Sequence, residues 1–135
     1  MKKLPYLLIL AAELCIIAPS VLAHHSFAAD YDASMPITVR GTVIKVEWMN
    51  PHVRFFLAEK GDSGKVTNWE FELGSPNTLM RSGWTRESLK AGAEITVKAV
   101  RSKDSSNLGN ATSILSSDGK VLLSGVSAGE TLVAR

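Results

Sequence analysis

The fold of this chain is decided by residues 68–77, which read Asn68-Trp69-Glu70-Phe71-Glu72-Leu73-Gly74-Ser75-Pro76-Asn77. Apolar side chains alternate there with polar ones up to Leu73, and this period of two predicts a strand with one face in the core. The alternation stops at Ser75, a residue type that caps helices, and Pro76 suits the first helical position. The centre of the chain is therefore predicted to be a strand that runs into a short helix.

Two more strands are predicted before this segment. Residues 37–48 are rich in β-branched side chains, and Gly41 suits a bend within so long a strand. Residues 53–57 also alternate, and they follow Asn50-Pro51, a dipeptide typical of turns. The first half of the chain is therefore predicted to be rich in β-structure.

The second half is predicted to return to strands after a helical segment. We expect the first helix to end at Gly83, and Thr85 can cap a second short helix that continues through Lys90. Strands resume at residues 94–101, and Asp118-Gly119 is a strong hairpin turn. The segments that flank this turn are residues 111–116 and 120–124.

Three strands, a helical segment and two more strands follow one another in the order of an OB-fold. The sequence therefore predicts a mainly β fold, a small OB-fold-like five-stranded Greek-key barrel with a short helical insert between strands three and four. A β-sandwich is the alternative, but it does not explain the central helical insert. We expect the barrel to span residues 37–124, after an N-terminal arm (24–36) and before a weakly ordered tail (125–135).

Residues 1–23 have the pattern of a cleavable signal peptide. Two lysines precede an apolar run, residues 4–17, that is too short to cross a bilayer, and Val21-Leu22-Ala23 has the small residues that signal peptidase accepts. Cleavage after Ala23 leaves no stable membrane anchor and predicts a periplasmic or secreted protein, whereas cleavage after Ala28 is the competing possibility. Because the only cysteine, Cys15, leaves with the signal peptide, we expect no disulfide in the exported domain.

The charge of the chain argues against one class of partner. Its formal net charge is +2, basic and acidic side chains are interspersed, and no basic stripe runs along any predicted element. We therefore expect no nucleic-acid partner. The exported part, residues 24–135, is long enough to build one hydrophobic core.

Three histidines give the sharpest functional prediction. If the mature chain begins at His24, its α-amine and imidazole can close a chelate ring, and His25 and His52 can supply further nitrogens. Nitrogen ligands in such a histidine brace favour Cu(II). We therefore predict a copper site at these three residues, with Asp30 or Asp32 as a weak oxygen ligand or hydrogen-bond acceptor. To reach His52, the arm has to fold back along the first strand.

A structural interpretation of the same histidines stays open. His24 and His25 can be solvated residues next to a cleavage site. His52 can be a partly buried turn residue that pairs with Glu70 or Glu72. The sequence alone does not decide between this interpretation and the copper site.

The loop between strands one and two lies on the ligand side of an OB-fold. Here this loop is residues 49–51, and the residues predicted to line a ligand face around it are Trp48, Asn50, Arg54 and Trp84. Trp69 is expected in the core because it alternates with polar residues. We predict a non-enzymatic binding domain for an unknown small ligand, with copper as its most concrete form. The alternatives are a copper-dependent oxidase or monooxygenase, and a structural accessory protein that pairs with another envelope protein.

Several motifs occur together in an order that resembles one protein family. They are His24-His25-Ser26-Phe27, Gly41-Thr42-Val43, Glu47-Trp48, Asn50-Pro51-His52, Asn68-Trp69, Phe71-Glu72-Leu73-Gly74-Ser75-Pro76-Asn77, Gly83-Trp84-Thr85 and Leu89-Lys90-x-Gly92. On these motifs the chain resembles an uncharacterised family of small exported proteins from Gram-negative bacteria, over nearly all of residues 24–117. The resemblance implies export and a single β-rich domain. It implies no catalytic residues, because none are established for that family.

Overall fold

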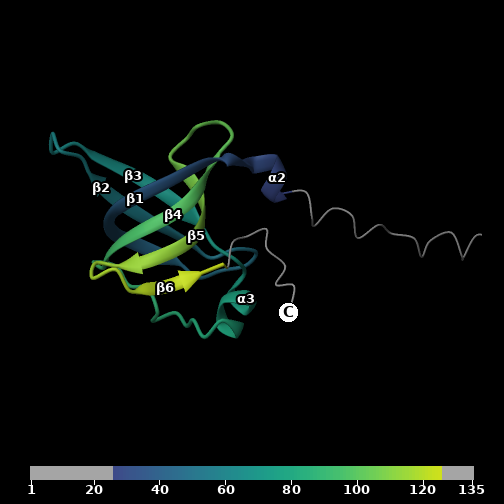
Figure 1. Cartoon of the computed structure of the whole chain (residues 1–135). Helices are drawn as coiled ribbons and strands as arrows, with labels where there is room; N and C mark the ends of the chain where they lie inside the picture. Colours follow the sequence, from purple (N-terminus) through teal and green to yellow (C-terminus); the bar gives the residue numbers. More distant parts are fainter. Residues whose placement is uncertain (1–25, 126–135) are drawn as a thin grey trace, which may run out of the picture.

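The computed structural model describes residues 26–125 of the chain (Figure 1). The predicted signal peptide, His24, His25 and residues 126–135 of the predicted tail lie outside these residues. The described elements are α2 (Ser26–Asp30), β1 (Tyr31–Glu47), β2 (Arg54–Lys60), β3 (Val66–Glu72), α3 (Pro76–Arg81), β4 (Glu94–Ser102), β5 (Leu108–Ser116) and β6 (Val121–Ser124). The fold is mainly β, as the sequence predicts.

The six described strands belong to one sheet whose hydrogen bonds form a ring. In the order β3-β2-β1-β4-β5-β6 all neighbours are antiparallel, and an additional parallel pairing between β3 and β5 closes the ring. The predicted number of five strands is wrong by one, because the residues after the hairpin turn form β6 on β5. Gly119 makes this turn with a φ of +83°, and its N–H donates to the Ser116 carbonyl at 2.9 Å.

β1 is longer than the sequence predicts, because it begins at Tyr31 and not at residue 37. Its first part pairs with β4 and its second part with β2, and the pairing changes partner around residues 41–43. A Cβ atom at Gly41 would lie 2.3 Å from the carbonyl oxygen of Ala58 on β2. Only glycine therefore permits β1 and β2 to approach so closely at this point.

α3 begins where the sequence predicts the helix. The Ser75 hydroxyl oxygen accepts a hydrogen bond from the backbone N–H of Thr78 at 3.2 Å, and Pro76 occupies the first turn. The chain leaves the helix through Gly83, whose φ is +84°. Both predicted helix signals are therefore confirmed.

The second predicted helix, residues 85–90, is wrong, because this segment forms turns. Its polar side chains bind the local backbone: the N–H of Thr85 donates to Ser88 Oγ at 2.8 Å, and the N–H of Glu87 donates to Thr85 Oγ1 at 3.2 Å. Such local hydrogen bonds compete with helix formation. Leu89 is still 4% exposed, so the segment contributes to the core without being helical.

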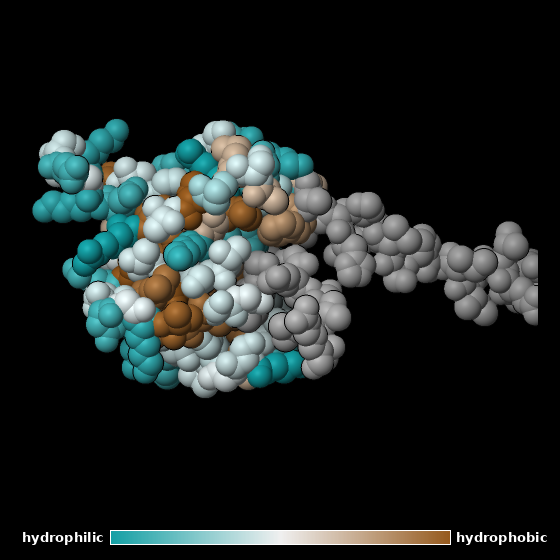
Figure 2. Space-filling view, in the orientation of Figure 1, coloured by the Kyte–Doolittle hydropathy of each residue, from teal (hydrophilic) through white to brown (hydrophobic). Residues whose placement is uncertain are grey.

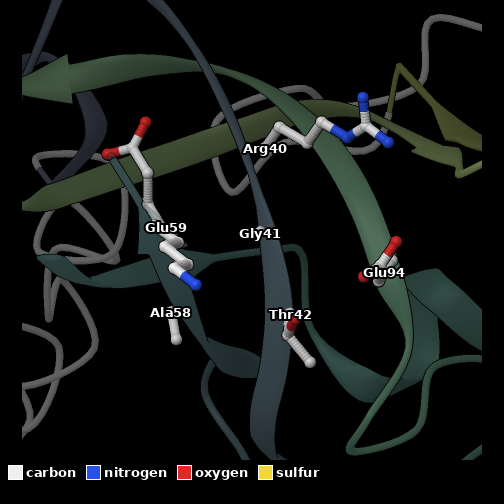
Figure 3. A pocket seen from close by; sticks show the side chains of 7 residues that line it. Arg40, Gly41, Thr42, Ala58, Glu59 and Glu94 are labelled. Carbon is white, nitrogen blue, oxygen red and sulfur yellow. The ribbon is translucent and has the colours of Figure 1, made fainter. Parts of the chain in front are cut away.

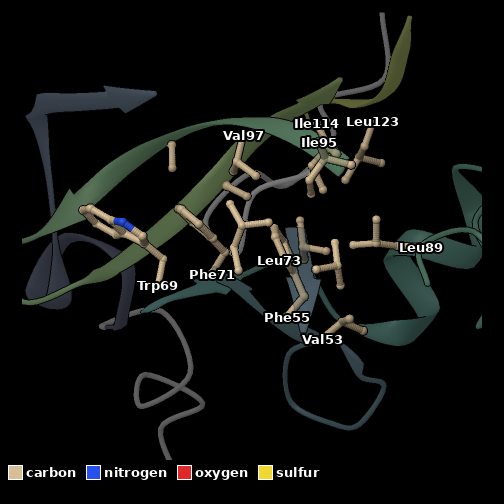
Figure 4. Packing of buried hydrophobic residues seen from close by; sticks show 14 of the residues in the cluster. Val53, Phe55, Trp69, Phe71, Leu73, Leu89, Ile95, Val97, Ile114 and Leu123 are labelled. Carbon is tan, nitrogen blue, oxygen red and sulfur yellow. The ribbon is translucent and has the colours of Figure 1, made fainter. Parts of the chain in front are cut away.

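Apolar side chains from all six described strands, from α3 and from the segment after it fill the interior of the ring (Figure 4). Trp69, Phe71 and Leu73 are 9%, 0% and 0% exposed, as their alternation predicts. Phe71 stacks on Phe55 and on Trp69, with 5.3 Å and 5.9 Å between ring centroids. The face seen in Figure 2 is mostly polar, with a few apolar residues grouped near its centre. No helix within residues 26–125 has the length and apolar character needed to cross a membrane.

Candidate functional site

Polar side chains gather on the outer face of the sheet near the end of β3. We call them the outer polar cluster: Tyr31, His52, Arg54, Glu70 and Glu72. Arg54 pairs with Glu72 across β2 and β3, and the next pair along the same strands is Phe55 with Phe71. Because successive side chains of a strand point to opposite faces, burial of the two phenylalanines places the charged pair outside.

Glu72 is the centre of the cluster, because its two carboxylate oxygens face different partners. Oε1 lies 3.5 Å from Nε2 of His52. Oε2 accepts a hydrogen bond from the Tyr31 hydroxyl at 3.1 Å and lies 3.6 Å from Nη2 of Arg54. The Glu72 and His52 side chains are 12% and 22% exposed, so water screens these contacts only weakly. His52 is thus a partly buried residue beside a carboxylate, as its structural interpretation predicts.

Tyr31 joins the cluster from the other end of the ring. It pairs with Ser102 on β4, whereas Glu72 pairs with Asn110 on β5. Although β4 and β5 separate β1 from β3 on this side of the ring, the Tyr31 hydroxyl reaches the Glu72 carboxylate. Phe27 of α2 packs on the phenol with 5.5 Å between ring centroids. Ring closure therefore brings the start of the described chain beside the end of β3.

The predicted route of the N-terminal arm is wrong in one respect. The sequence predicts that the arm folds back along the first strand to reach His52. In the structure, residues 31–36 are part of β1, and Tyr31 already contacts Glu72. Only α2 separates Tyr31 from His25, which lies outside the described residues. The closure of the ring thus brings Tyr31, and not a returning arm, to Glu72, and sequence periodicity carries no information on that closure.

The environment of Tyr31 fixes its protonation state. Burial raises the pKa of its hydroxyl most, followed by the negative charge of Glu72 and the hydrogen bond to it, while the charge of Arg54 acts in the opposite direction. The residue is 4% exposed, so an ionised phenolate would lack hydration. Tyr31 is therefore a stable hydrogen-bond donor to the carboxylate throughout the neutral pH range.

Two buried side chains next to Glu72 have polar atoms without hydrogen-bond partners in the described part of the chain. They are Nδ1 of His52 and both amide atoms of Asn110, a residue that is 0% exposed. Asn110 pairs with Glu72 and alternates with the core residue Ala111, so its side chain lies on the outer face of the sheet. A buried polar group without a partner costs about 1–3 kcal/mol.

A cavity of about 300 Å³ lies beside the cluster, between α2, β3 and the loop after β4. Its walls include Tyr31, Arg54, Glu72, Asp30, Ser102 and Asp104. Hydrogen bonds from the Ser102 hydroxyl and from the Ser106 backbone and hydroxyl hold the pKa of Asp104 at about 2. The cavity therefore presents carboxylates and a guanidinium together, and it offers polar contacts of both signs to a small molecule.

A second cavity, of about 360 Å³, lies over the contact of β1 and β2 at Gly41 (Figure 3). Arg40, Glu59 and Glu94 line it from three different strands, and in Figure 3 these side chains do not converge on one point. This second cavity shows no arrangement of groups suited to a reaction.

The residues predicted to line a ligand face lie in different surroundings. Arg54 belongs to the outer polar cluster, where its Nη1 lies 3.0 Å from Oε1 of Glu70. Asn50 is exposed and precedes Pro51 through a cis peptide bond. Trp48 is partly buried and packs against the core cluster. Of these residues, Arg54 alone is a member of the outer polar cluster.

Trp84 departs furthest from its predicted place on a ligand face. It is 6% exposed and belongs to the core cluster. Its indole N–H donates to the carbonyl oxygen of Leu122 at 2.9 Å, which satisfies the one polar group of the side chain. The turn at Gly83, with its positive φ, precedes this inward-facing residue. Trp84 therefore closes the interior near β6.

The predicted copper ligands are only partly described. His52 is described, whereas His24 and His25 lie outside residues 26–125. Within that range no three His, Cys, Asp or Glu side chains lie close enough together to hold a metal ion. Asp32 accepts hydrogen bonds from the backbone and hydroxyl of Ser34, which lower its pKa, and so its carboxylate already has partners. The copper site therefore stays a prediction.

The central position of Glu72 was missed by sequence reasoning. Its alternation with Phe71 does predict that its side chain points outward. Its contact with Tyr31, however, depends on the parallel pairing of β3 with β5, which joins parts of the chain that are far apart in sequence. No local pattern reports such a pairing.

Comparison with known proteins places the chain in a family. Residues 12–111 match the family model DUF6152, described as a family of unknown function, and this range includes the whole outer polar cluster. The chain matches no curated protein and no solved structure. The chain therefore belongs to DUF6152, a family of unknown function.

Proposed function

We propose that this chain is a small exported binding domain of the OB type, without catalytic activity of its own. The ring order β1-β2-β3-β5-β4, its parallel closure and the helix between β3 and β4 support an OB-type Greek-key barrel, with β6 as an addition on β5. The signal-peptide pattern of residues 1–23 supports export to the periplasm or secretion.

The ligand in this proposal is Cu(II). The mature N-terminal His24 binds it through the α-amine and the imidazole, and His25 and His52 supply further nitrogens. Such a nitrogen-rich ligand set favours copper among the common divalent metals. The α-amine has an ordinary pKa of about 7.7–8.0, so copper displaces a proton near neutral pH and its affinity rises as the pH increases.

One observation carries the proposal: Tyr31 and His52 face the same carboxylate, Glu72. α2 has 5 residues, and His25 directly precedes it. A helix of that length spans about 7–8 Å at about 1.5 Å per residue. In the proposed site, the N-terminal segment of a chain that begins at His24 therefore has to cover about the length of α2, and not the whole length of β1, to come near His52.

The proposal is tested on protein that cells have exported and processed, after its N-terminus has been sequenced. A chain that begins at His24 is expected to bind one Cu(II) in a calorimetric titration. His24→Ala and His52→Ala are each expected to weaken binding about tenfold or more. Acetylation of the His24 α-amine keeps every side chain but removes the amine from the chelate ring, so it is expected to weaken binding as well. Equal affinity in all variants, or a mature chain that begins at Ala29, contradicts the proposal.

An oxygen-consumption assay on the same exported protein distinguishes copper binding from oxidative catalysis. Copper-loaded protein is supplied with a reductant and oxygen, and oxygen consumption is followed. A binding domain is expected to show no turnover above that of the His24→Ala variant. Sustained consumption that requires His24 favours the alternative, a copper-dependent oxidase or monooxygenase. Absence of copper binding, together with co-purification of another envelope protein, favours a structural accessory role.

A further inference from the structure

We propose that the cavity beside the outer polar cluster binds a small α-amino acid in its zwitterionic form. The cavity lies between α2, β3 and the loop after β4, and every residue that lines it lies within residues 26–125. Its volume of about 300 Å³ equals that of about ten water molecules at about 30 Å³ each, which is enough for a small amino acid. Binding there requires neither a metal nor any residue before α2.

The residues that line the cavity carry charges of both signs. Arg54 and Glu72 come from β2 and β3, Asp30 ends α2, and Asp104 lies in the loop after β4. A zwitterion can place its carboxylate at the guanidinium and its ammonium at the carboxylates, so that both of its charges are paired. A simple anion would also face the carboxylates, and a simple cation would also face Arg54 and Lys103. The lining therefore favours a ligand with one charge of each sign.

Arg54 suits the carboxylate end of such a ligand. Its guanidinium carries N–H donors in a planar fork, a geometry that matches a carboxylate. Nη1 donates to Oε1 of Glu70 at 3.0 Å, whereas Nη2 lies 3.6 Å from Oε2 of Glu72, too far for a hydrogen bond. The Arg54 side chain is 46% exposed and lines the cavity. The guanidinium therefore has donors left for a ligand.

Asp104 suits the ammonium end, because the loop after β4 keeps its carboxylate ionised and in place. Oδ1 accepts hydrogen bonds from the Ser102 hydroxyl and from the backbone N–H of Ser106, which hold the pKa of Asp104 at about 2. Arg101 fixes the same loop, because its Nε and Nη2 donate to the carbonyl oxygens of Ser106 and Ser105 at 3.0 Å and 2.6 Å. An ionised carboxylate has about four acceptor positions. Asp104 can therefore accept further hydrogen bonds from an ammonium group.

A buried amide beside the cavity lacks both of its hydrogen-bond partners. Asn110 is 0% exposed, pairs with Glu72 across β3 and β5, and lies two residues from Leu108 on the same strand. Glu72 and Leu108 both line the cavity, and the register places the amide on the same face of the sheet as these two residues. Among residues 26–125, neither Nδ2 nor Oδ1 has a partner. Buried amides are normally hydrogen-bonded, and a zwitterion brings both the acceptor and the donor that this amide lacks.

The first test is a calorimetric titration of the whole protein with each standard amino acid, in a buffer with EDTA so that no metal takes part. At least one small amino acid, such as L-alanine, is expected to bind with one-to-one stoichiometry. Its N-acetyl derivative lacks the positive charge and its amide derivative lacks the negative charge. Both are expected to bind about tenfold more weakly or worse. Absence of saturable binding by every amino acid, or unchanged affinity for either derivative, overturns the site.

Charge variants place the bound amino acid in this cavity. Arg54→Gln and Asp104→Asn each remove one charge from the lining and are expected to weaken binding about tenfold or more. Arg40→Gln is the matched control, because it removes another exposed arginine, one that lines the second cavity, and it is expected to keep the affinity. Unchanged affinity in Arg54→Gln and Asp104→Asn, or equal losses in all three variants, overturns the site.

A further variant keeps the test decisive if a charge variant does not fold, which circular dichroism reports. Asn110→Leu removes the amide but no charge, and it is expected to weaken binding roughly threefold or more. Its free energy of unfolding is expected to rise, so weaker binding indicates a lost contact with the ligand and not a damaged fold. Binding as tight as that of the wild type overturns the position of the ligand beside Asn110.

Discussion

The interior of the ring and the outer polar cluster lie on opposite faces of the same sheet. Buried groups find packing partners in the interior, whereas some buried polar atoms near the outer cluster have no described hydrogen-bond partner. Inside, Phe55 and Phe71 are 0% exposed and pack among apolar side chains. On the outer side, polar atoms of His52, just before β2, and of Asn110, on β5, are buried without a described partner. Since buried polar groups are normally hydrogen-bonded, the two faces serve different purposes.

The difference teaches where to look for function in a chain whose family has none established. The interior supplies the free energy that keeps the ring folded. The outer polar cluster lies where Tyr31, at the start of β1, contacts the end of β3, and its polar groups surround one central carboxylate, Glu72. Proteins tolerate buried polar atoms without partners mainly at functional sites. The predictions below test this contrast, from the largest expected effect to the smallest.

The largest effect is expected from the interior. Phe71→Ala removes a fully buried ring that stacks on two others, and it is expected to lower the free energy of unfolding by about 3–5 kcal/mol. Glu72→Gln, at the next residue but on the outer face, is expected to lower it by less than half as much. Urea denaturation followed by tryptophan fluorescence measures both. A greater loss for Glu72→Gln would show that the cluster, and not the interior, holds the ring together.

An effect of opposite sign is expected at Asn110. Leucine has nearly the same shape but no polar atoms, so Asn110→Leu removes two unpartnered buried atoms without leaving a void. We expect the free energy of unfolding to rise by about 1–3 kcal/mol, the cost of an unsatisfied polar group. The same urea experiment measures it. Destabilisation by Asn110→Leu would mean that the amide has a partner beyond the described residues, and the contrast between the two faces would then weaken.

The smallest effect is expected at Tyr31, and it depends on pH. Because the folded protein raises the pKa of this hydroxyl above its ordinary value of 10.0, the hydroxyl contributes its full stability below pH 10.0 and loses it as the pH rises further. Tyr31→Phe is therefore expected to cost about 1 kcal/mol at neutral pH. The difference between wild type and variant is expected to shrink in alkaline solution. A difference that stays constant in alkaline urea titrations would show that the tyrosine is not buried against a negative charge.

Local patterns in the sequence predicted the parts of the fold that depend on neighbouring residues. The alternation around Phe71 predicted a half-buried strand, and Ser75 with Pro76 predicted the start of α3. The helix predicted at residues 85–90 does not form, because the Thr85 and Ser88 side chains accept hydrogen bonds from nearby backbone N–H groups. Helix propensity alone does not predict this competition between side-chain and helical hydrogen bonds.

The candidate site was less predictable, because ring closure brings its residues together. His52 beside a glutamate was one of two open interpretations, and the structure pairs it with Glu72. Tyr31 lay in a predicted arm, yet it is a strand residue whose hydroxyl donates to Glu72. The pairing of β3 with β5 is non-local, and a single sequence contains no period or spacing that reports it.

We propose that ring closure brings the mature N-terminus to the pair of His52 and Glu72. The most direct test of this proposal is the addition of paramagnetic Cu(II) to isotope-labelled mature protein, followed by nuclear magnetic resonance. The account predicts that the amide signals of Tyr31, His52 and Glu72 broaden together and that the change is complete at one equivalent. Broadening confined to the residues before α2, with the signals of His52 and Glu72 unaffected, would contradict it.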